Sequence, residues 1–222
     1  KRFHETFPKV EITYPKETKK EMRVLTREEQ TQFVGYLLEG MDECKFGILL
    51  TLLTGIRIGE LCALRWENIS LKDKTIKISS TMQRLKDISL NRETKTRIVI
   101  GSPKSDTSAR IIPINDYAAE LCRRMNPKSP AAFVLTGTSN YMEPRTLQYR
   151  MEKYTGDCGL EGVHFHTLRH TFATRCVEVG FEIKSLSEIL GHANTTITLD
   201  RYVHSSMELK RDNMNKLALV GF

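Results

Sequence analysis

Hydrophobic residues recur at helical spacing near the start of the chain. Thr26 and Glu29 have the Ser/Thr-x-x-Glu spacing of a capping box, and Phe33 and Leu37 follow on one helical face. Further apolar residues at helical spacing run up to a Thr-Gly pair, which favours the end of a helix. The pattern predicts one helix from about residue 27, a second that ends at Gly55, and a short third one over 58–64.

The pattern changes in the middle third of the chain. Short β-branched stretches at 76–78, 98–100 and 111–112 alternate with charged segments that contain Gly, Ser or Asp. The predicted fold class is therefore α+β and mostly α, with one small antiparallel β-sheet that contains a long hairpin. Helical spacing returns after the sheet, and we expect helices at roughly 115–125, 143–156, 166–179, 182–190, 195–203 and 206–217.

One charged residue of the predicted helix at 166–179 falls on its apolar face. At about 100° per residue, Leu168, Phe172 and Cys176 lie within the same half of the helical wheel, and Arg169 lies near the centre of that half. Because burying an unpaired guanidinium costs roughly several kcal/mol, we expect an anion to meet it. The sequence leaves two anions open, a carboxylate of the fold and a phosphate of a ligand.

Composition and charge indicate which partners and which cellular compartment to expect. The 222-residue chain carries a formal net charge of +7, which favours a polyanionic partner such as nucleic acid, although simple solubility explains the charge equally well. Its five cysteines are scattered without a Cys-x-x-Cys pair, as in proteins whose thiols stay reduced. No apolar run approaches the ~18 residues that span a bilayer. We therefore expect a cytoplasmic protein without a membrane partner.

A tyrosine near the end of the chain and a set of arginines and histidines before it have the chemistry of a phosphate clamp. Tyr202 is a poor nucleophile unless neighbouring groups activate it and neutralise the charge on its target. Arg57, His166, Arg169 and His192 supply guanidinium and imidazole groups for that purpose.

The pair His166 and His170 also has the i, i+4 spacing of zinc ligands. No glutamate follows His166 to complete a His-Glu-x-x-His arrangement, and no cysteine pair lies nearby. We therefore expect no metal site.

Four stretches stand out by their residue types and their order. They are Thr-Gly-Ile-Arg-Ile-Gly-Glu-Leu at 54–61, His-Thr-Leu-Arg-His-Thr-Phe-Ala at 166–173, Leu-Gly-His at 190–192, and the segment at 195–204 that contains Tyr202. Together they resemble the catalytic domain of the tyrosine recombinases, the phage-integrase family. The resemblance implies that family's helical fold with a small antiparallel sheet. The charged hairpin at 82–108 is similar to integrases of conjugative transposons and temperate phages.

The resemblance also implies a reaction and a role for each residue. Tyr202 would attack a DNA phosphodiester and form a 3′-phosphotyrosyl bond, so that strands are cleaved and rejoined without a metal or nucleotide cofactor. Glu60 is explained equally by an i, i+3 salt bridge to Arg57. The implied roles are phosphate binding for Arg57 and Arg169, acid or base for His166, hydrogen bonding for His192, protonation of the leaving 5′-oxygen for Lys104, and support for Glu60.

The family's organisation further implies domains and partners. Residues 1–24 would be a linker from a missing N-terminal DNA-binding region, and residues 25–222 the catalytic domain, with a C-terminal helix from about 206. The implied partner is double-stranded DNA at attachment sites, bound by a homotetramer whose isolated subunit is a monomer. Arg145 and Arg150, at the start of a predicted helix, are further candidates for phosphate contacts.

Two other functions are compatible with such a fold. A catalytically idle DNA-binding module would have a damaged site, yet every residue that the reaction needs is present. A type IB topoisomerase-like enzyme shares the chemistry but relaxes supercoils as a monomer, whereas recombination joins two duplexes. The sequence favours a site-specific recombinase that integrates or excises a mobile element.

Overall fold

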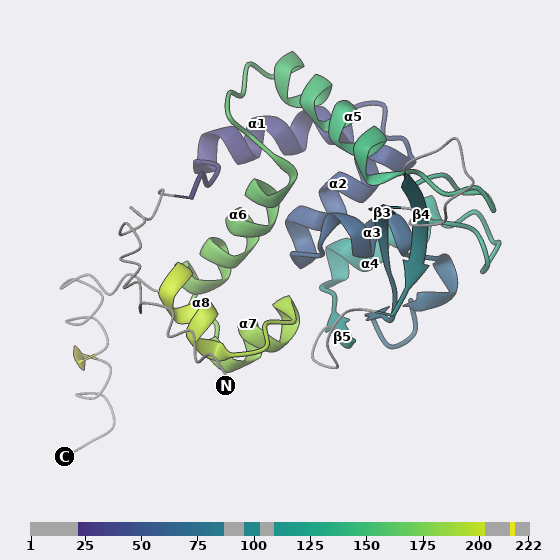
Figure 1. The fold of residues 1–222 in the computed structure, drawn as a ribbon. Helices are drawn as coiled ribbons and strands as arrows, with labels where there is room; N and C mark the ends of the chain where they lie inside the picture. Colours follow the sequence, from purple (N-terminus) through teal and green to yellow (C-terminus); the bar gives the residue numbers. More distant parts are fainter. Residues whose placement is uncertain (1–21, 87–95, 103–108, 203–213, 216–222) are drawn as a thin grey trace, which may run out of the picture.

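Helices occupy both ends of the described chain, and short strands lie between them (Figure 1). The computed structural model describes residues 22–86, 96–102, 109–202 and 214–215. This arrangement confirms the predicted α+β, mostly α fold. In chain order the elements are α1 (Arg27–Leu38), α2 (Glu43–Thr54), α3 (Ile58–Ala63), the 3-10 turn η1 (Trp66–Asn68), β1 (Ile69–Ser70), β2 (Thr75–Ile78), β3 (Thr81–Lys86), β4 (Thr96–Gly101), β5 (Arg110–Pro113), α4 (Asp116–Met125), α5 (Pro144–Asp157), α6 (Phe165–Glu178), α7 (Ile183–Leu190) and α8 (Thr195–Tyr202).

The first helices begin and end where their local signals predict. The Thr26 hydroxyl accepts a hydrogen bond from the Glu29 amide at 3.1 Å, and the Glu29 carboxylate accepts one from the Thr26 amide at 2.8 Å. These two bonds complete the capping box of α1. Helix α2 ends at Gly55, whose φ of +66° lies in the left-handed region that favours glycine. Arg57 follows this turn and caps α3.

The strands form two small antiparallel sheets, whereas the sequence predicted one. Strands β1, β2 and β5 pair in that order, with Ile76 opposite Ile112. Strands β3 and β4 form a separate ladder from Thr81 opposite Gly101 to Lys86 opposite Thr96. Because β2 already pairs with β1 along one edge and with β5 along the other, no edge of β2 remains for β3.

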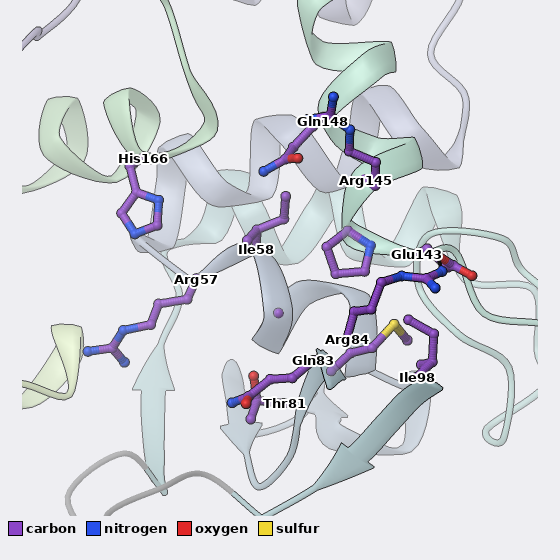
Figure 2. Close-up of a pocket in the computed structure, with 13 residues that line it drawn as sticks. Arg57, Ile58, Thr81, Gln83, Arg84, Ile98, Glu143, Arg145, Gln148 and His166 are labelled. Atoms are coloured by element: carbon purple, nitrogen blue, oxygen red, sulfur yellow. Dashed lines mark hydrogen bonds and ion pairs between the residues drawn. The ribbon is translucent and has the colours of Figure 1, made fainter. Parts of the chain in front are cut away.

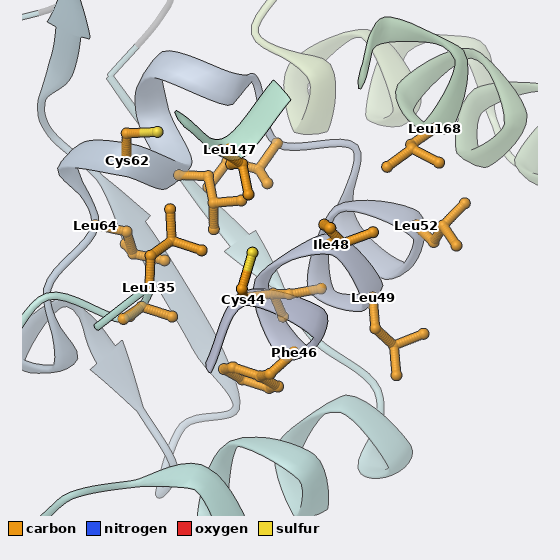
Figure 3. Close-up of a cluster of buried hydrophobic side chains, with 14 of the residues drawn as sticks. Cys44, Phe46, Ile48, Leu49, Leu52, Cys62, Leu64, Leu135, Leu147 and Leu168 are labelled. Carbon is orange, nitrogen blue, oxygen red and sulfur yellow. The ribbon is translucent and has the colours of Figure 1, made fainter. Parts of the chain in front are cut away.

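The main hydrophobic core forms around α2. Figure 3 shows side chains from α2, α3, α5 and α6 meeting there, among them Leu147 and Leu168. Phe46 stacks on Trp66, with ring centroids 5.8 Å apart and planes inclined by 4°. Each large apolar side chain buried in this way stabilises the fold by about 1.5–3 kcal/mol. The core therefore fixes the turn between α2 and α3, which carries Arg57.

A second and smaller cluster joins α6, α7 and α8. Figure 1 shows these helices together, on the side of the molecule away from β3 and β4. Helix α7 ends at Gly191, which has a φ of +63° and turns the chain toward α8. The apolar members of this cluster are Ala173, Cys176, Leu186, Leu190 and Tyr202.

Two predicted segments fall mainly outside the described residues. The predicted linker at 1–24 lies outside them up to residue 21, and of the predicted helix at 206–217 only residues 214–215 are described. Among the described residues, no helix has the length and apolar character needed to cross a bilayer.

Candidate active site

Arg169 lies at the centre of the site and is almost completely buried. Its side chain comes from α6 and only 4% of the residue is exposed, which confirms the inward position predicted from helical periodicity. Its guanidinium donates to the carbonyl oxygens of Gly55 and Leu190, each at 2.7 Å. Within the described chain no carboxylate pairs with Arg169, so backbone carbonyls satisfy part of its hydrogen-bonding capacity. Burial and the neighbouring Arg57 charge lower the pKa of Arg169 to about 9, which leaves it charged at neutral pH.

Arg57 is held in place by a buried carboxylate. Its guanidinium donates to Glu60 Oε1 at 2.8 Å and to the Gly191 carbonyl at 2.8 Å, and its backbone amide donates to Glu60 Oε2 at 2.9 Å. The Glu60 side chain is only 3% exposed, whereas that of Arg57 is 32% exposed. Glu60 therefore aims the guanidinium of Arg57 while leaving part of it accessible.

Arg110 is the second cation bound to Glu60. Its two terminal nitrogens donate to the two carboxylate oxygens at 2.8 and 2.9 Å, and its Nε donates to the Ile189 carbonyl at 2.5 Å. Burial alone would raise the pKa of Glu60, but the bonds from Arg110 and Arg57 hold that pKa below its usual value. Arg110 thus links β5 to α3 and to the end of α7.

His192 contacts Arg169 through one ring nitrogen and Thr198 through the other. Nε2 lies 3.0 Å from Arg169 Nη2, and Nδ1 lies 2.8 Å from Thr198 Oγ1. A guanidinium can only donate, so Nε2 accepts and the ring proton lies on Nδ1, which donates to Thr198. Burial and the charges of Arg169 and Arg57 lower the pKa of His192 to about 3, in agreement with a neutral ring.

The predicted arginines and histidines surround one cavity of about 300 Å³, which we call the arginine cavity. Three arginines and three histidines lie in its lining, and none of the described residues contributes a carboxylate to it, so it is suited to an anion. Partial burial and the charges of Arg169 and Arg57 lower the pKa of His166. The lining consists of Arg57, His166, Arg169, His170, Gly191, His192, Ala193, Ile197 and Arg201.

Tyr202 lies next to the arginine cavity and does not line it. The residue is 6% exposed, and its hydroxyl is 2.7 Å from Nδ1 of His170. Burial raises the pKa of Tyr202, although the charges of Arg169 and Arg201 act in the opposite direction. The hydroxyl is therefore protonated at neutral pH.

A second cavity, of about 450 Å³, adjoins the first at Arg57 and His166 (Figure 2). Arg145, at the start of α5, lines it, and an ion pair between Arg84 and Glu143 lies at its far end. We call this second cavity the hairpin groove, because β3 and β4 form one of its walls. The groove therefore extends away from the arginine cavity, from Arg57 and His166 toward Arg145.

The structure separates the two further arginines that the sequence proposed for phosphate contacts. Arg150 lines neither cavity, although it follows Arg145 on α5. Its guanidinium instead lies near Cys44, Tyr154 and Asp42 at the start of α2. Lys104, the predicted proton donor, lies outside the described residues.

Sequence reasoning did not assign a role to His170, Arg110 or Arg201, all of which contact or line the site. The i, i+4 spacing of His166 and His170 was the available signal for His170, and it was interpreted only in terms of zinc. Within the described part of the chain, no group of His, Cys, Asp or Glu side chains has the arrangement of a metal site. Arg110 and Arg201 carry no local signal, because their contacts depend on distant segments.

Comparison with known proteins identifies the family of this chain. The model of the phage integrase family matches residues 23–208, and the chain therefore belongs to the phage integrase family. A tyrosine recombinase from Pseudothermotoga lettingae is 33% identical over 180 residues, which cover 78% of this chain and 54% of that relative. The transposase from transposon Tn916 of Enterococcus faecalis is 26% identical over 231 residues, which cover 96% of this chain and 52% of the relative. The chain spans about half the length of these two relatives.

Solved structures share the fold of this chain. The Tn1549 transposon integrase, solved in complex with transposon right end DNA, superposes with a TM-score of 0.73 at 22% sequence identity. The match covers 92% of this chain and 68% of that one. The similarity confirms the predicted tyrosine recombinase catalytic-domain fold.

Proposed function

We propose that this chain is the catalytic domain of a site-specific DNA recombinase that cleaves and rejoins strands through Tyr202. The observation that carries the proposal is the arginine cavity, which Arg57 and Arg169 line and to which the described part of the chain contributes no carboxylate. Backbone carbonyls and Glu60 hold the two guanidinium groups in place. Donors that are fixed in advance stabilise charge as it develops on a phosphate, because they need no reorganisation during the reaction.

In the proposed reaction, the Tyr202 oxygen attacks the phosphorus of a DNA phosphodiester. A bond forms between that oxygen and phosphorus, and the bond from phosphorus to the 5′-oxygen breaks, which leaves a 3′-phosphotyrosyl link and a 5′-hydroxyl. Arg57 and Arg169 bind the non-bridging oxygens, for which the planar guanidinium suits better than an ammonium. Lys104 protonates the departing 5′-oxygen.

Two histidines and a carboxylate complete the proposed machinery. His192 holds Arg169 through its neutral ring, and Glu60 holds Arg57. His166 acts as acid or base toward the phosphate from the lining of the cavity. Attack by a 5′-hydroxyl of another strand reverses the first step. Because one phosphodiester replaces another, the scheme requires neither nucleotide hydrolysis nor a metal.

The proposed substrate is double-stranded DNA at the attachment sites of a mobile element. Support comes from the transposase of transposon Tn916 and from the Tn1549 integrase, whose solved structure contains transposon DNA. The net charge of +7 and the position of Arg145 in the hairpin groove favour a polyanion. We propose a homotetramer on DNA, a monomer in isolation, and residues 1–24 as a linker to an N-terminal DNA-binding region before the catalytic domain at 25–222.

Covalent trapping tests the nucleophile. The protein is incubated with a nicked suicide duplex, in the presence of a chelator, and protein attached to DNA is separated under denaturing conditions. Tyr202→Phe is expected to form no adduct while keeping DNA affinity, because the variant lacks only the attacking oxygen. Tyr117→Phe is the matched control on α4, where the tyrosine is 47% exposed, and is expected to form as much adduct as the wild type.

The same assay separates the alternatives. A wild-type protein that binds the duplex without forming an adduct would contradict the proposal and favour an idle DNA-binding module. Relaxation of supercoiled plasmid without exchange between two labelled duplexes would favour a type IB topoisomerase-like enzyme. The expected result is strand exchange between the two duplexes.

A further inference from the structure

The hydroxyl proton of Tyr202 must leave when its oxygen attacks phosphorus. A neutral phenol is a weak nucleophile, so a neighbouring base has to take this proton during attack. His166 occupies the position that the family resemblance assigns to an acid or base. The ring nitrogen that is hydrogen-bonded to the hydroxyl belongs instead to His170, at 2.7 Å.

His170 stands between the nucleophile and the arginine cavity. It follows His166 by one turn of α6, and the centroids of their rings are 6.3 Å apart. The ring of His170 is 5.7 Å from that of Tyr202, centroid to centroid. His170 lines the cavity and Tyr202 does not, so the imidazole faces both the tyrosine oxygen and the space for a phosphate.

We propose that His170, rather than His166, accepts the Tyr202 proton when the tyrosine attacks phosphorus. The inference rests on the proposed function of strand cleavage. As the bond from Oη to phosphorus forms, the proton passes from Oη to Nδ1 of His170. The bond from phosphorus to the 5′-oxygen breaks, and that oxygen takes a separate proton, from Lys104 in the proposed scheme. During rejoining, His170 returns its proton to Tyr202.

The charges around His170 explain how DNA would activate it. Burial lowers the pKa of His170 to about 4, and His166, Arg201 and Arg169 contribute in the same direction. These groups and Tyr202 face it from α6 and α8. A phosphodiester in the arginine cavity brings a negative charge that offsets these cations and raises the pKa of His170 toward its usual value. His170 therefore becomes an effective base only when DNA is bound.

Single-turnover cleavage by His170→Gln tests the assignment. The glutamine amide can hydrogen-bond to Tyr202 but cannot take a proton. The substrates are two nicked duplexes of one sequence, selected for binding from a random library, with oxygen or sulfur at the bridging 5′ position of the scissile phosphate. A thiolate leaves without protonation, so sulfur rescues the loss of an acid but not the loss of a base. We expect cleavage about 10²-fold slower than wild type on both substrates.

The pH profile gives a second readout, which a purely structural role would not change. Without an internal base, the rate of His170→Gln is expected to rise with pH as solvent hydroxide replaces the imidazole, whereas the wild-type rate changes little near neutral pH. His164→Gln, an exposed histidine that precedes the same helix, is the control and should cleave at the wild-type rate. Thermal unfolding shows whether His170→Gln is folded. If it is not, His170→Asn serves as the second variant, because its amide lies close to the position of Nδ1.

Two results would overturn the assignment. One is cleavage by the folded variant within about 3-fold of wild type, well short of the expected loss. The other is a defect that disappears with the sulfur substrate, because His170 would then act on the leaving group. Failure of the wild type to form any Tyr202 adduct on a bound duplex would instead contradict the proposed function, so the two failures are distinguishable.

Discussion

The part of the site around Arg57 and Arg169, which we call the arginine side, has more hydrogen bonds than the part around Tyr202, which we call the tyrosine side. On the arginine side, Arg57 is held by Glu60 and by the Gly191 carbonyl, and Arg169 donates to two further backbone carbonyls. On the tyrosine side, the hydrogen bond recorded for the Tyr202 hydroxyl among the described residues is the one to His170. The proposed phosphate-binding arginines are therefore fixed by several hydrogen bonds, whereas the hydroxyl of the proposed nucleophile is fixed by one among the described residues.

The arginine side also rests on more extensive hydrophobic packing than the tyrosine side. The turn that carries Arg57 is fixed by the large core around α2, while Tyr202 belongs to the small cluster of α6, α7 and α8. Helix α8 packs mainly on α7 and α6. Stabilising charge on a phosphate requires fixed donors, whereas the proposed nucleophile forms a bond to phosphorus and later releases it. The contrast suits a reversible reaction.

Removing Arg169 is expected to have the largest effect, because it damages both chemistry and fold. Arg169→Ala should slow adduct formation by about 10²- to 10³-fold, as losses of single charge-stabilising donors do. It also leaves the carbonyls of Gly55 and Leu190 without their donor, at about 1–3 kcal/mol of unfolding free energy for each. The measurements are single-turnover cleavage and urea unfolding followed by Trp66 fluorescence.

A surface arginine provides the control for this variant. Arg123 lies on α4 with a side chain that is 57% exposed, and it pairs with Glu120. Arg123→Ala is expected to change the unfolding free energy by no more than about 0.5 kcal/mol and to cleave normally. Cleavage by Arg169→Ala at the wild-type rate would show that Arg169 is not part of the phosphate site.

Arg110→Met is expected to lower the unfolding free energy by about 3–5 kcal/mol at pH 7, because it breaks a buried ion pair with Glu60 on the arginine side. Arg110 and Arg57 hold the pKa of Glu60 below its usual value, so the Glu60 carboxylate stabilises the native protein down to acid pH. Without Arg110, only the bonds from Arg57 oppose the effect of burial, so the pKa of Glu60 rises and ionised Glu60 becomes more costly at neutral pH. The stability gap to wild type should therefore narrow as pH falls toward 4. Urea unfolding across this range measures it.

The double variant Glu60→Gln with Arg110→Met separates the ion pair from packing. It removes the charge of a buried carboxylate that retains only Arg57 as a cationic partner, so it should recover part of the stability that Arg110→Met loses and show a weaker pH dependence. If the double variant is less stable than Arg110→Met at pH 7, the loss arises from the contacts of the Arg110 side chain rather than from the buried charge of Glu60.

Features with local causes could be predicted from the sequence. The capping box at Thr26, the end of α2 at Gly55 and the inward position of Arg169 each depend on residues within a few turns of one helix. The split of the strands into two sheets depends instead on which edge of β2 is already paired, and spacing along the chain does not contain that information.

The interior of the site was less predictable for the same reason. Of the two anions that the sequence left open for Arg169, no carboxylate of the described chain pairs with it. The protein groups that contact it are His192 and carbonyls at the ends of α2 and α7, and every backbone carbonyl looks alike in a sequence. The pairing of Arg110 with Glu60 crosses 50 positions. The contact of His170 with Tyr202 crosses 32, and only the fold brings these pairs together.

Acid pH is expected to destabilise the tyrosine side more than the arginine side, by less than the substitutions above. Burial and nearby arginine charges lower the pKa of His192 to about 3, and burial and nearby cations lower that of His170 to about 4, against about 6.5 in an unfolded chain. Between these values the unfolded chain binds protons that the native chain does not, so the unfolding free energy falls as pH falls below about 6.5. The pKa of Glu60 is also lowered, but from an ordinary value near 4.5, so this carboxylate is largely ionised in both the native and the unfolded chain between pH 7 and pH 5 and contributes little to this change.

Hydrogen exchange at pH 7 and pH 5, corrected for the intrinsic pH dependence of exchange, tests this difference. Amides of α7 and α8 should lose protection at pH 5 relative to those of α3, because His192 takes up a proton when these helices open locally and its bond from Arg169 is broken, which favours the open state. His192→Gln keeps an acceptor without a titrating ring and should reduce the loss, whereas His164→Gln, outside the site, should not. Equal loss of protection in α3 would mean that the arginine side is no more resistant to acid than the tyrosine side, and the contrast between them would not extend to their stability.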